Sequence, residues 1–385
     1  MARNGRNSLF KQFFESEKSG GLTLIFFTLL SIVLANTEFS SEYVHFWEKD
    51  LGPMSIEHWV NDVLMSVFFL LIGLELKREF KNGELSNLKS ASLPIISAMG
   101  GMLVPALIFI LFNISESTIT GFGIPMATDI AFALGVLSLL GNRVPLSLKV
   151  FLTALAVIDD LGAVLVIAIF YTKTILWTYL LISIGIFWFL LLLNRWKVTD
   201  LLVYIPLGVI MWCFMHLSGV HSTIAGVLFA FALPSYQKRG KRSPSEVLQK
   251  ALHFPVPFVI LPIFALANTA IPVFLNWGMS FDESLGFGVV LGLVAGKPLG
   301  IFLFAFLAVK LKLSSLPHKV SWSNLLGAGL LGGIGFTMSI FVALLAFDDK
   351  ETVDSAKICI LIASITAALL GLLWLHFSLK QRTSK

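Results

Sequence analysis

Charge and cysteine are both scarce in this chain of 385 residues. Charged residues make up only 13% of the sequence, far below the share of about 25% in a soluble domain, whereas 56% of the residues are hydrophobic. This composition excludes a soluble globular fold and indicates an integral membrane protein. Cys213 and Cys359 lie in separate apolar runs, which argues against a disulfide framework or a zinc site and leaves both as apolar filler.

A cleavable signal peptide and a β-barrel pattern are also lacking. Basic residues precede the first apolar run, but no small-residue cleavage pattern follows it, so we expect this run to be retained. The apolar runs are longer than the alternating strands of about 10 residues that build a barrel, so they predict helices. The chain leaves no room for a large soluble domain, shows no basic patch for nucleic acid, and predicts no cofactor.

Twelve apolar segments predict an all-α polytopic membrane protein in the lipid bilayer. They are residues 20–36, 59–76, 91–112, 121–140, 150–171, 175–193, 201–217, 223–233, 254–271, 285–309, 325–347 and 358–379. The segment 223–233 is short for a span of about 20 residues. We keep it because without it the charges of the loops no longer alternate.

The loops predict the orientation of a single transmembrane domain over residues 1–385. Lysine and arginine concentrate in alternate loops, which is the positive-inside pattern and explains the net charge of +5. We therefore expect both termini in the cytoplasm. Residues 1–19, 235–252 and 380–385 are the predicted cytoplasmic segments, and residues 37–58 the long outer loop. That loop is either a small hairpin suited to homodimer contact or an interfacial loop with an aromatic belt.

Four ionisable residues lie deep inside the predicted spans: Asp129, Asp159, Asp160 and Lys297. A charge near the bilayer midplane costs at least ~2.5 kcal/mol on insertion scales, so such residues usually mark an ion or proton path. A buried ion pair that only fixes helix packing is the alternative.

Adjacent Asp159 and Asp160, in ALAVIDDLGAV, point about 100° apart on a helix, so one can line a cavity while the other faces a neighbouring helix. Two such carboxylates repel when both are ionised, so protons and a cation compete for the same oxygens. Lys297, in LVAGKPLGI, lies where Gly296, Pro298 and Gly300 loosen the helix, and we expect it to pair with Asp159.

Two spans carry helix-breaking residues near mid-membrane. One is GFGIPMATDIAFALG and the other GAGLLGGIGFTMSIF, with Gly123, Pro125, Thr128 and Asp129 in the first and Gly333, Gly335 and Thr337 in the second. A pair of interrupted segments of opposite direction is typical of inverted-repeat transporters. Close helix packing through small residues is the alternative for the glycines. In the first interpretation Asp129 offsets the positive helix ends and Lys297 the negative ones.

Two further residues are weaker candidates. Glu75 and Arg78 are i,i+3 neighbours at the end of the second span, where an ion pair at a cavity mouth or an ordinary interfacial salt bridge fits. His221, in LSGVHSTIAGV, lies at a helix start, where a pH-responsive, a capping and a packing role all remain open.

These motifs, together with VNDVLMSVFFLLIGLELKREF and GIGFTMSIF, resemble the NhaA-type sodium/proton antiporters of bacterial inner membranes over essentially the whole chain. The resemblance implies twelve helices, two inverted three-helix repeats and interrupted helices that cross at the fourth and eleventh spans. It implies Na⁺ or Li⁺ binding at Asp160 and Asp159 with help from Asp129 and Thr128. It associates Glu75 and His221 with a response to pH, whereas Gln249 stands where the family pattern has an acid.

The sequence therefore favours a secondary antiporter that exports Na⁺ or Li⁺ in exchange for protons. A sodium-coupled symporter of an organic anion is the alternative, but it needs several fixed positive donors and the spans offer Lys297 alone. An intramembrane aspartyl protease needs two carboxylates from different helices. The adjacent pair does not supply them, and Asp129 with Asp160 is the one combination that would. A passive channel has no use for a site at which protons and cations compete.

Overall fold

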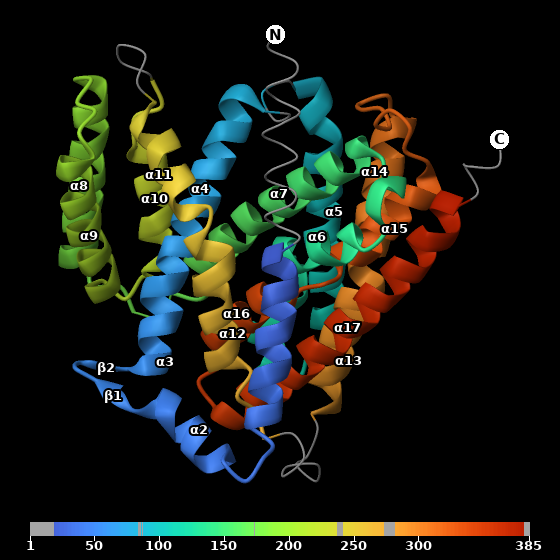
Figure 1. Cartoon of the computed structure of the whole chain (residues 1–385), viewed down its shortest axis with the longest axis horizontal. Coiled ribbons are helices and arrows are strands. Elements are labelled where there is room, and N and C mark those ends of the chain that lie inside the picture. The colour runs from blue at the N-terminus through green and yellow to red at the C-terminus, as the bar shows by residue number, and fades with distance from the viewer. Residues whose placement is uncertain are drawn as a thin grey trace.

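The computed structural model describes residues 19–83, 86, 88–172, 174–236, 242–272 and 282–380. Residues 1–18, 237–241 and 381–385, which belong to the predicted cytoplasmic segments, lie outside this description. The described chain is almost entirely helical and contains one two-stranded sheet (Figure 1). The predicted all-helical class is therefore confirmed.

The described elements follow one another along the chain with short connections. After the helix Ser19–Leu34 they are α2 (Ser40–Glu48), β1 (Asp50–Leu51), β2 (Met54–Ser55), α3 (Ile56–Trp59), η1 (Val60–Leu64), α4 (Met65–Asn82), α5 (Leu88–Asn113), η3 (Ser117–Met126), α6 (Ile130–Ser138), η4 (Gly141–Arg143), α7 (Leu146–Phe170), α8 (Trp177–Arg195), α9 (Leu201–Leu217), α10 (Thr223–Ala232), α11 (Pro244–Leu252), η5 (Val256–Ile260), α12 (Leu261–Asn268), α13 (Glu283–Leu291), η6 (Gly292–Gly296), α14 (Lys297–Lys310), α15 (Trp322–Gly332), α16 (Phe336–Ala346) and α17 (Lys350–Lys380). Here η1, η5 and η6 are π-helical turns, and η3 and η4 are 3₁₀ helices.

Seven stretches of helix in the described residues are long and apolar enough to cross a membrane. Two bent pairs, η3 with α6 and α15 with α16, raise that number to nine if each pair is one span, with bends of 45° and 46°. Ser19–Leu34, α9 and α10 are shorter apolar helices. The chain is thus a multi-pass membrane protein, while the count of twelve spans stays a prediction.

The short predicted segment 223–233 corresponds to α10. Its 10 residues extend about 15 Å, roughly half the hydrocarbon thickness of a bilayer. It packs closely along α4, because Gly226 leaves no room for a Cβ beside the backbone of Ser66, and Gly73 leaves none beside Ala230. Small residues on both helices thus let a short helix lie deep in the bundle.

The predicted outer loop 37–58 forms helix α2, a hairpin and the beginning of α3, so the hairpin of the first alternative is present. Strand β1 pairs with β2 in antiparallel register, with Asp50 opposite Ser55 and Leu51 opposite Met54. Gly52 in the turn has a φ of +74°, a conformation that favours glycine. We call the end of the molecule that carries α2, β1, β2 and α3 the hairpin end (Figure 1).

Helices α5 and α14 cross at a pair of glycines. A Cβ at Gly100 would overlap the carbonyl oxygen of Gly300, and a Cβ at Gly300 would overlap that of Gly100. Just before this crossing, the chain makes the π-helical turn η6, which ends where Lys297 and Pro298 begin α14. The predicted loosening of the helix at Lys297 is therefore present, and it lies where two helices approach most closely.

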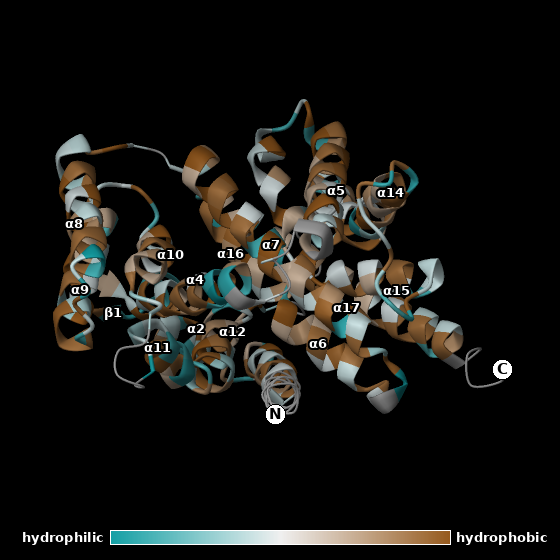
Figure 2. Ribbon diagram, turned by 90° about the horizontal axis from the view of Figure 1, so that it is seen from above, coloured by the Kyte–Doolittle hydropathy of each residue, from teal (hydrophilic) through white to brown (hydrophobic). Residues whose placement is uncertain are grey.

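Hydrophobic residues make up most of the helical ribbon (Figure 2), and many large apolar side chains are exposed on the outside of the bundle. On α8 only Ser183, Leu190 and Leu193 are buried, and Leu202 on α9 is 81% exposed. Such an exposed apolar surface is unfavourable in water and fits the hydrocarbon core of a bilayer. The polar groups that remain inside the bundle therefore need a specific explanation.

Candidate functional site

The two helix breaks contact each other inside the bundle. The first comprises residues 127–129 between η3 and α6, and the second residues 333–335 between α15 and α16. The backbone N–H of Asp129 donates to the carbonyl of Ile334 at 2.7 Å, and the Thr128 hydroxyl donates to the carbonyl of Gly332 at 2.9 Å. Each break thus satisfies backbone groups of the other, as irregular backbone at this depth requires.

Asp129 caps two helices with one carboxylate. Its Oδ1 accepts from the backbone N–H of Phe132 in α6 at 2.9 Å. Its Oδ2 accepts from the N–H of Thr337 in α16 at 3.1 Å and from the Thr337 hydroxyl. Both helices point their positive N-terminal ends at this carboxylate, which compensates them. Asp129 is 2% exposed, and its described hydrogen bonds occupy both oxygens.

Lys297 joins Asp159 to the end of η3. Its Nζ lies 3.0 Å from Asp159 Oδ2, and both side chains are fully buried. The same ammonium donates to the carbonyl of Met126, the last residue of η3. Lys297 therefore neutralises a carboxylate and satisfies a free helix-end carbonyl at once.

Asp159 and Asp160 hold the unsatisfied polar atoms of the site. Asp159 Oδ2 accepts from Lys297 and lies 2.8 Å from the Thr128 hydroxyl, whose single proton is shared between this carboxylate and the carbonyl of Gly332. Asp159 Oδ1 and both oxygens of Asp160 have no hydrogen-bond partner among the described residues, although both side chains are 0% exposed. Buried carboxylate oxygens without partners are costly and rare. These three oxygens are therefore ready to take protons or a small hard cation.

The glycines and the proline predicted for the interrupted helices lie in the 3₁₀ helix η3 and in the second helix break. Gly123 and Pro125 belong to the 3₁₀ helix η3, and Gly333 and Gly335 to the second break. At Gly333 a Cβ would overlap the carbonyl oxygen of Leu293 in η6. The break between α15 and α16 is therefore packed directly against the π-helical turn that precedes Lys297.

Glu75 is buried near the end of α4 opposite the hairpin and is hydrogen-bonded by the side chain of Gln249 on α11. Arg78 Nη2 lies 3.1 Å from Glu79 Oε1, so the ion pair of Glu75 with Arg78 stays a prediction. Gln249, the residue that departs from the family pattern, thus touches one of the two candidates for a response to pH.

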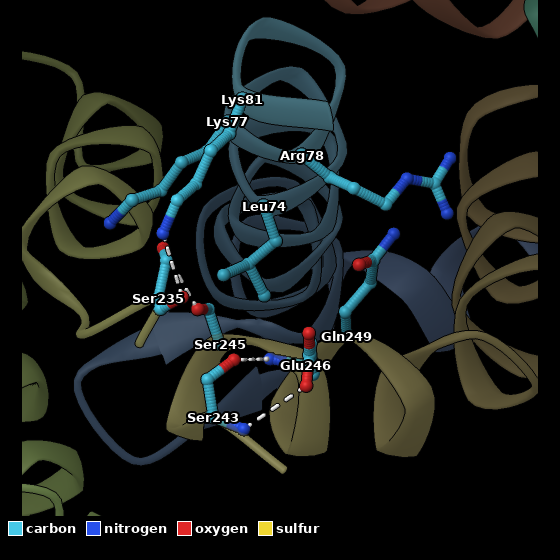
Figure 3. Close-up of a pocket in the computed structure, with 9 residues that line it drawn as sticks. All are labelled: Leu74, Lys77, Arg78, Lys81, Ser235, Ser243, Ser245, Glu246 and Gln249. Atoms are coloured by element: carbon cyan, nitrogen blue, oxygen red, sulfur yellow. Dashed lines mark hydrogen bonds between the residues drawn. The ribbon is translucent and has the colours of Figure 1, made fainter. Parts of the chain in front are cut away.

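A small pocket adjoins Glu75 between α4 and α11. Its lining comprises Leu74, Lys77, Arg78, Lys81, Ser235, Ser243, Ser245, Glu246 and Gln249 (Figure 3). Lys77 and Lys81 point to one side and Arg78 to the other. The Lys77 ammonium donates to the carbonyls of Ala230 at 3.2 Å, Phe231 at 2.7 Å and Leu233, and thereby caps the C-terminal end of α10.

His221 lies near the hairpin end of the bundle beside Tyr171. The His221 Nε2 is 3.2 Å from the carbonyl oxygen of Tyr171. This contact fits the packing role, and a role in a response to pH stays a prediction.

Sequence reasoning missed three side chains that hold the site in place. The Tyr171 hydroxyl accepts from the N–H of Gly123 at 3.2 Å and donates to the carbonyl of Thr120 at 2.8 Å. The Ser339 hydroxyl on α16 donates to the carbonyl of Ile124 at 2.7 Å. The Tyr171 and Ser339 hydroxyls thus hold η3 in place, and the third side chain, Lys77, holds the C-terminal end of α10. Hydroxyl groups within apolar runs were the available signal, but their partners lie far away in sequence.

Comparison with known proteins shows which family the chain resembles along most of its length. The sequence model of the Na⁺/H⁺ antiporter 1 family matches residues 11–375. The chain is 58% identical to the Na⁺/H⁺ antiporter NhaA of Flavobacterium psychrophilum over 97% of this chain and 96% of that protein. It is 54% identical to the Na⁺/H⁺ antiporter NhaA of Cytophaga hutchinsonii over 98% of this chain and 97% of that protein.

Proposed function

Since the chain belongs to the Na⁺/H⁺ antiporter 1 family, we propose that it exchanges Na⁺ for protons across the membrane by competition at Asp159 and Asp160. The family is one of transporters, and its named relatives favour antiport over the symport alternative. The observation that carries the site assignment is the set of three buried carboxylate oxygens without partners.

Asp160 is the principal ligand and proton carrier in this proposal. Neither of its oxygens has a hydrogen-bond partner among the described residues, so nothing must be broken before a proton or a cation binds. A carboxylate that holds a proton cannot give the same oxygen to Na⁺. Binding of one ion therefore releases the other, which is the step that exchange requires.

Asp159 is the second ligand and is held by Lys297 at 3.0 Å and by Thr128 at 2.8 Å. Its free Oδ1 binds the cation together with Asp160, and the contact with Lys297 breaks as the cation enters. Thr128 and Asp129 supply further oxygens beside them. Since Asp129 already caps α6 and α16, its part is chiefly to hold the two breaks in register.

Orientation and further partners belong to the same proposal. The distribution of basic residues supports cytoplasmic termini in a bacterial inner membrane. On that assignment the hairpin end faces outward, Na⁺ leaves the cytoplasm and protons enter. Li⁺ is a second transported cation, since it is also small and hard. A homodimer with the hairpin at its interface is the proposed assembly.

Replacement of Asp160 by asparagine tests the central residue. We expect Asp160→Asn to abolish Na⁺-dependent proton movement in proteoliposomes, because an amide neither attracts Na⁺ by charge nor releases a proton. Asp200→Asn is the matched control. Asp200 caps α9 outside the site by accepting from the N–H of Leu202 at 2.9 Å, and asparagine caps helices equally well.

Circular dichroism and detergent extraction of both variants check that the helices and the fold are intact. Exchange close to wild type in correctly folded Asp160→Asn protein would refute the assignment. Equal loss in the Asp200→Asn control would show that the assay reports folding rather than ion binding.

A further inference from the structure

The helix α16 that leaves the second break has a polar partner on α17, besides its contacts with the first break. The backbone N–H of Phe336, the first residue of α16, donates to the hydroxyl oxygen of Ser364 at 3.1 Å. Ser364 lies in the middle of α17, and both residues are 1% exposed. Bulk water therefore does not reach this N–H and cannot replace the hydroxyl as its acceptor.

The first two N–H groups of α16 have acceptors on different elements. Phe336 donates to Ser364 of α17, whereas the next N–H, that of Thr337, donates to Oδ2 of Asp129 at 3.1 Å. The first turn of a helix offers no partner of its own for these groups, so their acceptors determine where α16 begins. The start of α16 is therefore held between α17 and the first break.

A similar arrangement occurs at the first break. Helix α7 follows the first break along the chain as α17 follows the second. The Asp159 carboxylate of α7 contacts Thr128, 31 residues earlier, and the Ser364 hydroxyl of α17 contacts Phe336, 28 residues earlier. Each of these helices thus brings one buried polar side chain to the break before it. Ser364 carries no charge and already accepts a backbone N–H, so it holds the backbone rather than an ion.

The second break transmits its position to the ion site through two contacts. The carbonyl of Ile334 accepts from the N–H of Asp129 at 2.7 Å, and the carbonyl of Gly332 lies 2.9 Å from the Thr128 hydroxyl. The same hydroxyl lies 2.8 Å from Oδ2 of Asp159. Helix α17 also packs against α15, α16 and the π-helical turn η6. A shift of the second break therefore moves Thr128, and with it the surroundings of Asp159.

We propose that Ser364 is a positioning residue for cation binding, an inference that rests on the proposed function. Its hydroxyl fixes the first turn of α16 and thereby keeps Thr128 and Asp159 at the spacing that a cation needs. Without this hydroxyl the Phe336 N–H has to share the Asp129 carboxylate that now binds the next N–H, because an unpaired N–H in the interior is costly. Two N–H groups that compete for one oxygen draw the start of α16 out of its present position.

The Na⁺ dependence of exchange in Ser364→Ala tests the proposal at one fixed pH in proteoliposomes. The KM for Na⁺ should rise several-fold, up to about tenfold for one lost buried hydrogen bond, while kcat changes by less than about twofold. Ser364→Thr keeps the hydroxyl and should retain the wild-type KM. Thr366→Ala is the control on the same helix, because the Thr366 hydroxyl donates to the carbonyl of Ile362 within α17. If the alanine variant does not fold, Ser364→Cys carries the same expectation, since a thiol is a weak acceptor.

A second readout needs no transport. Thermal unfolding in detergent is followed as Na⁺ replaces choline at constant ionic strength, and Ser364→Ala should need more Na⁺ than wild type for half of the stabilisation. A KM that matches the Thr366→Ala control, or an equal rise in Ser364→Ala and Ser364→Thr, would overturn the positioning role. A wild-type protein that neither exchanges Na⁺ nor is stabilised by it would count against the proposed function instead.

Discussion

At the scale of single residues, the site combines carboxylates that have hydrogen-bond partners with carboxylates that lack them. Asp129 has partners on both oxygens, Asp159 on one, and Asp160 on neither among the described residues. This gradation follows from position. Asp129 lies at a helix start, where N–H groups are free, whereas Asp159 and Asp160 lie inside α7, where the helix uses its own N–H groups. The carboxylate oxygens without a partner among the described residues therefore lie on the latter pair.

Loss of Lys297 should destabilise the protein through the residue it leaves behind. Lys297→Ala leaves Asp159 buried opposite an empty space, which costs roughly 3 to 5 kcal/mol for a fully buried pair. We expect a lower melting temperature in detergent and a smaller effect on ion selectivity. Asp159→Asn in the same chain should recover part of the stability. If the two losses simply add, the residues do not act as a pair.

At the scale of helices, the points at which the helices are interrupted determine where the charged side chains of the site lie. The π-helical turn η6 and the crossing of Gly100 with Gly300 set the position from which Lys297 reaches Asp159 and the end of η3. The broken pairs place helix ends, rather than side chains alone, around the same point. The positions of these helix ends therefore determine where a buried charge is stabilised inside the bundle.

Filling the α5–α14 crossing should separate these helices. Gly300→Ala places a methyl group against the carbonyl of Gly100, and overpacking of this kind costs about 1 to 3 kcal/mol. Gly185→Ala on α8 is the matched control, because a Cβ there meets nothing within 4 Å. The control should be as stable as wild type or slightly more so. Equal melting temperatures for both variants would show that the crossing is not tight.

The hairpin end should show its own dependence on pH through Glu48. The ion pair with Lys350 of α17 holds the pKa of this carboxyl below its ordinary value, and His45 adds to the effect. A lowered pKa stabilises the fold above the ordinary glutamate range near pH 4.3 and loses that contribution as the pH falls. Glu48→Gln should therefore melt slightly below wild type at pH 7, and the difference should shrink as the pH falls below about 4.3. Because the pair is exposed, salt should reduce the difference, and a difference that persists in acid would contradict this assignment.

At the scale of the whole molecule, sequence reasoning predicts the helices, the deeply placed charged residues and the pairing of Lys297 with Asp159, but few of the other contacts between helices. Long apolar runs and deep carboxylates carry their signal locally, which is why Asp159, Asp160 and Lys297 were recognised. Other contacts join residues that lie far apart in the chain: Gln249 with Glu75, Tyr171 with Gly123, and Lys77 with the end of α10. Such pairs depend on how helices pack, and no local pattern encodes them. The helix α2 was missed because its short amphipathic sequence reads as a loop.

The central claim is that Na⁺ and protons compete for the same buried oxygens. Its most direct test is the apparent affinity for Na⁺, measured as Na⁺-dependent proton movement in proteoliposomes over a range of pH. The account predicts that this affinity weakens as the pH falls, by up to about tenfold per pH unit where one proton competes with one cation, and that saturating Na⁺ restores turnover. An affinity that stays constant from acid to alkaline pH would show that the two ions use separate sites and would contradict the account.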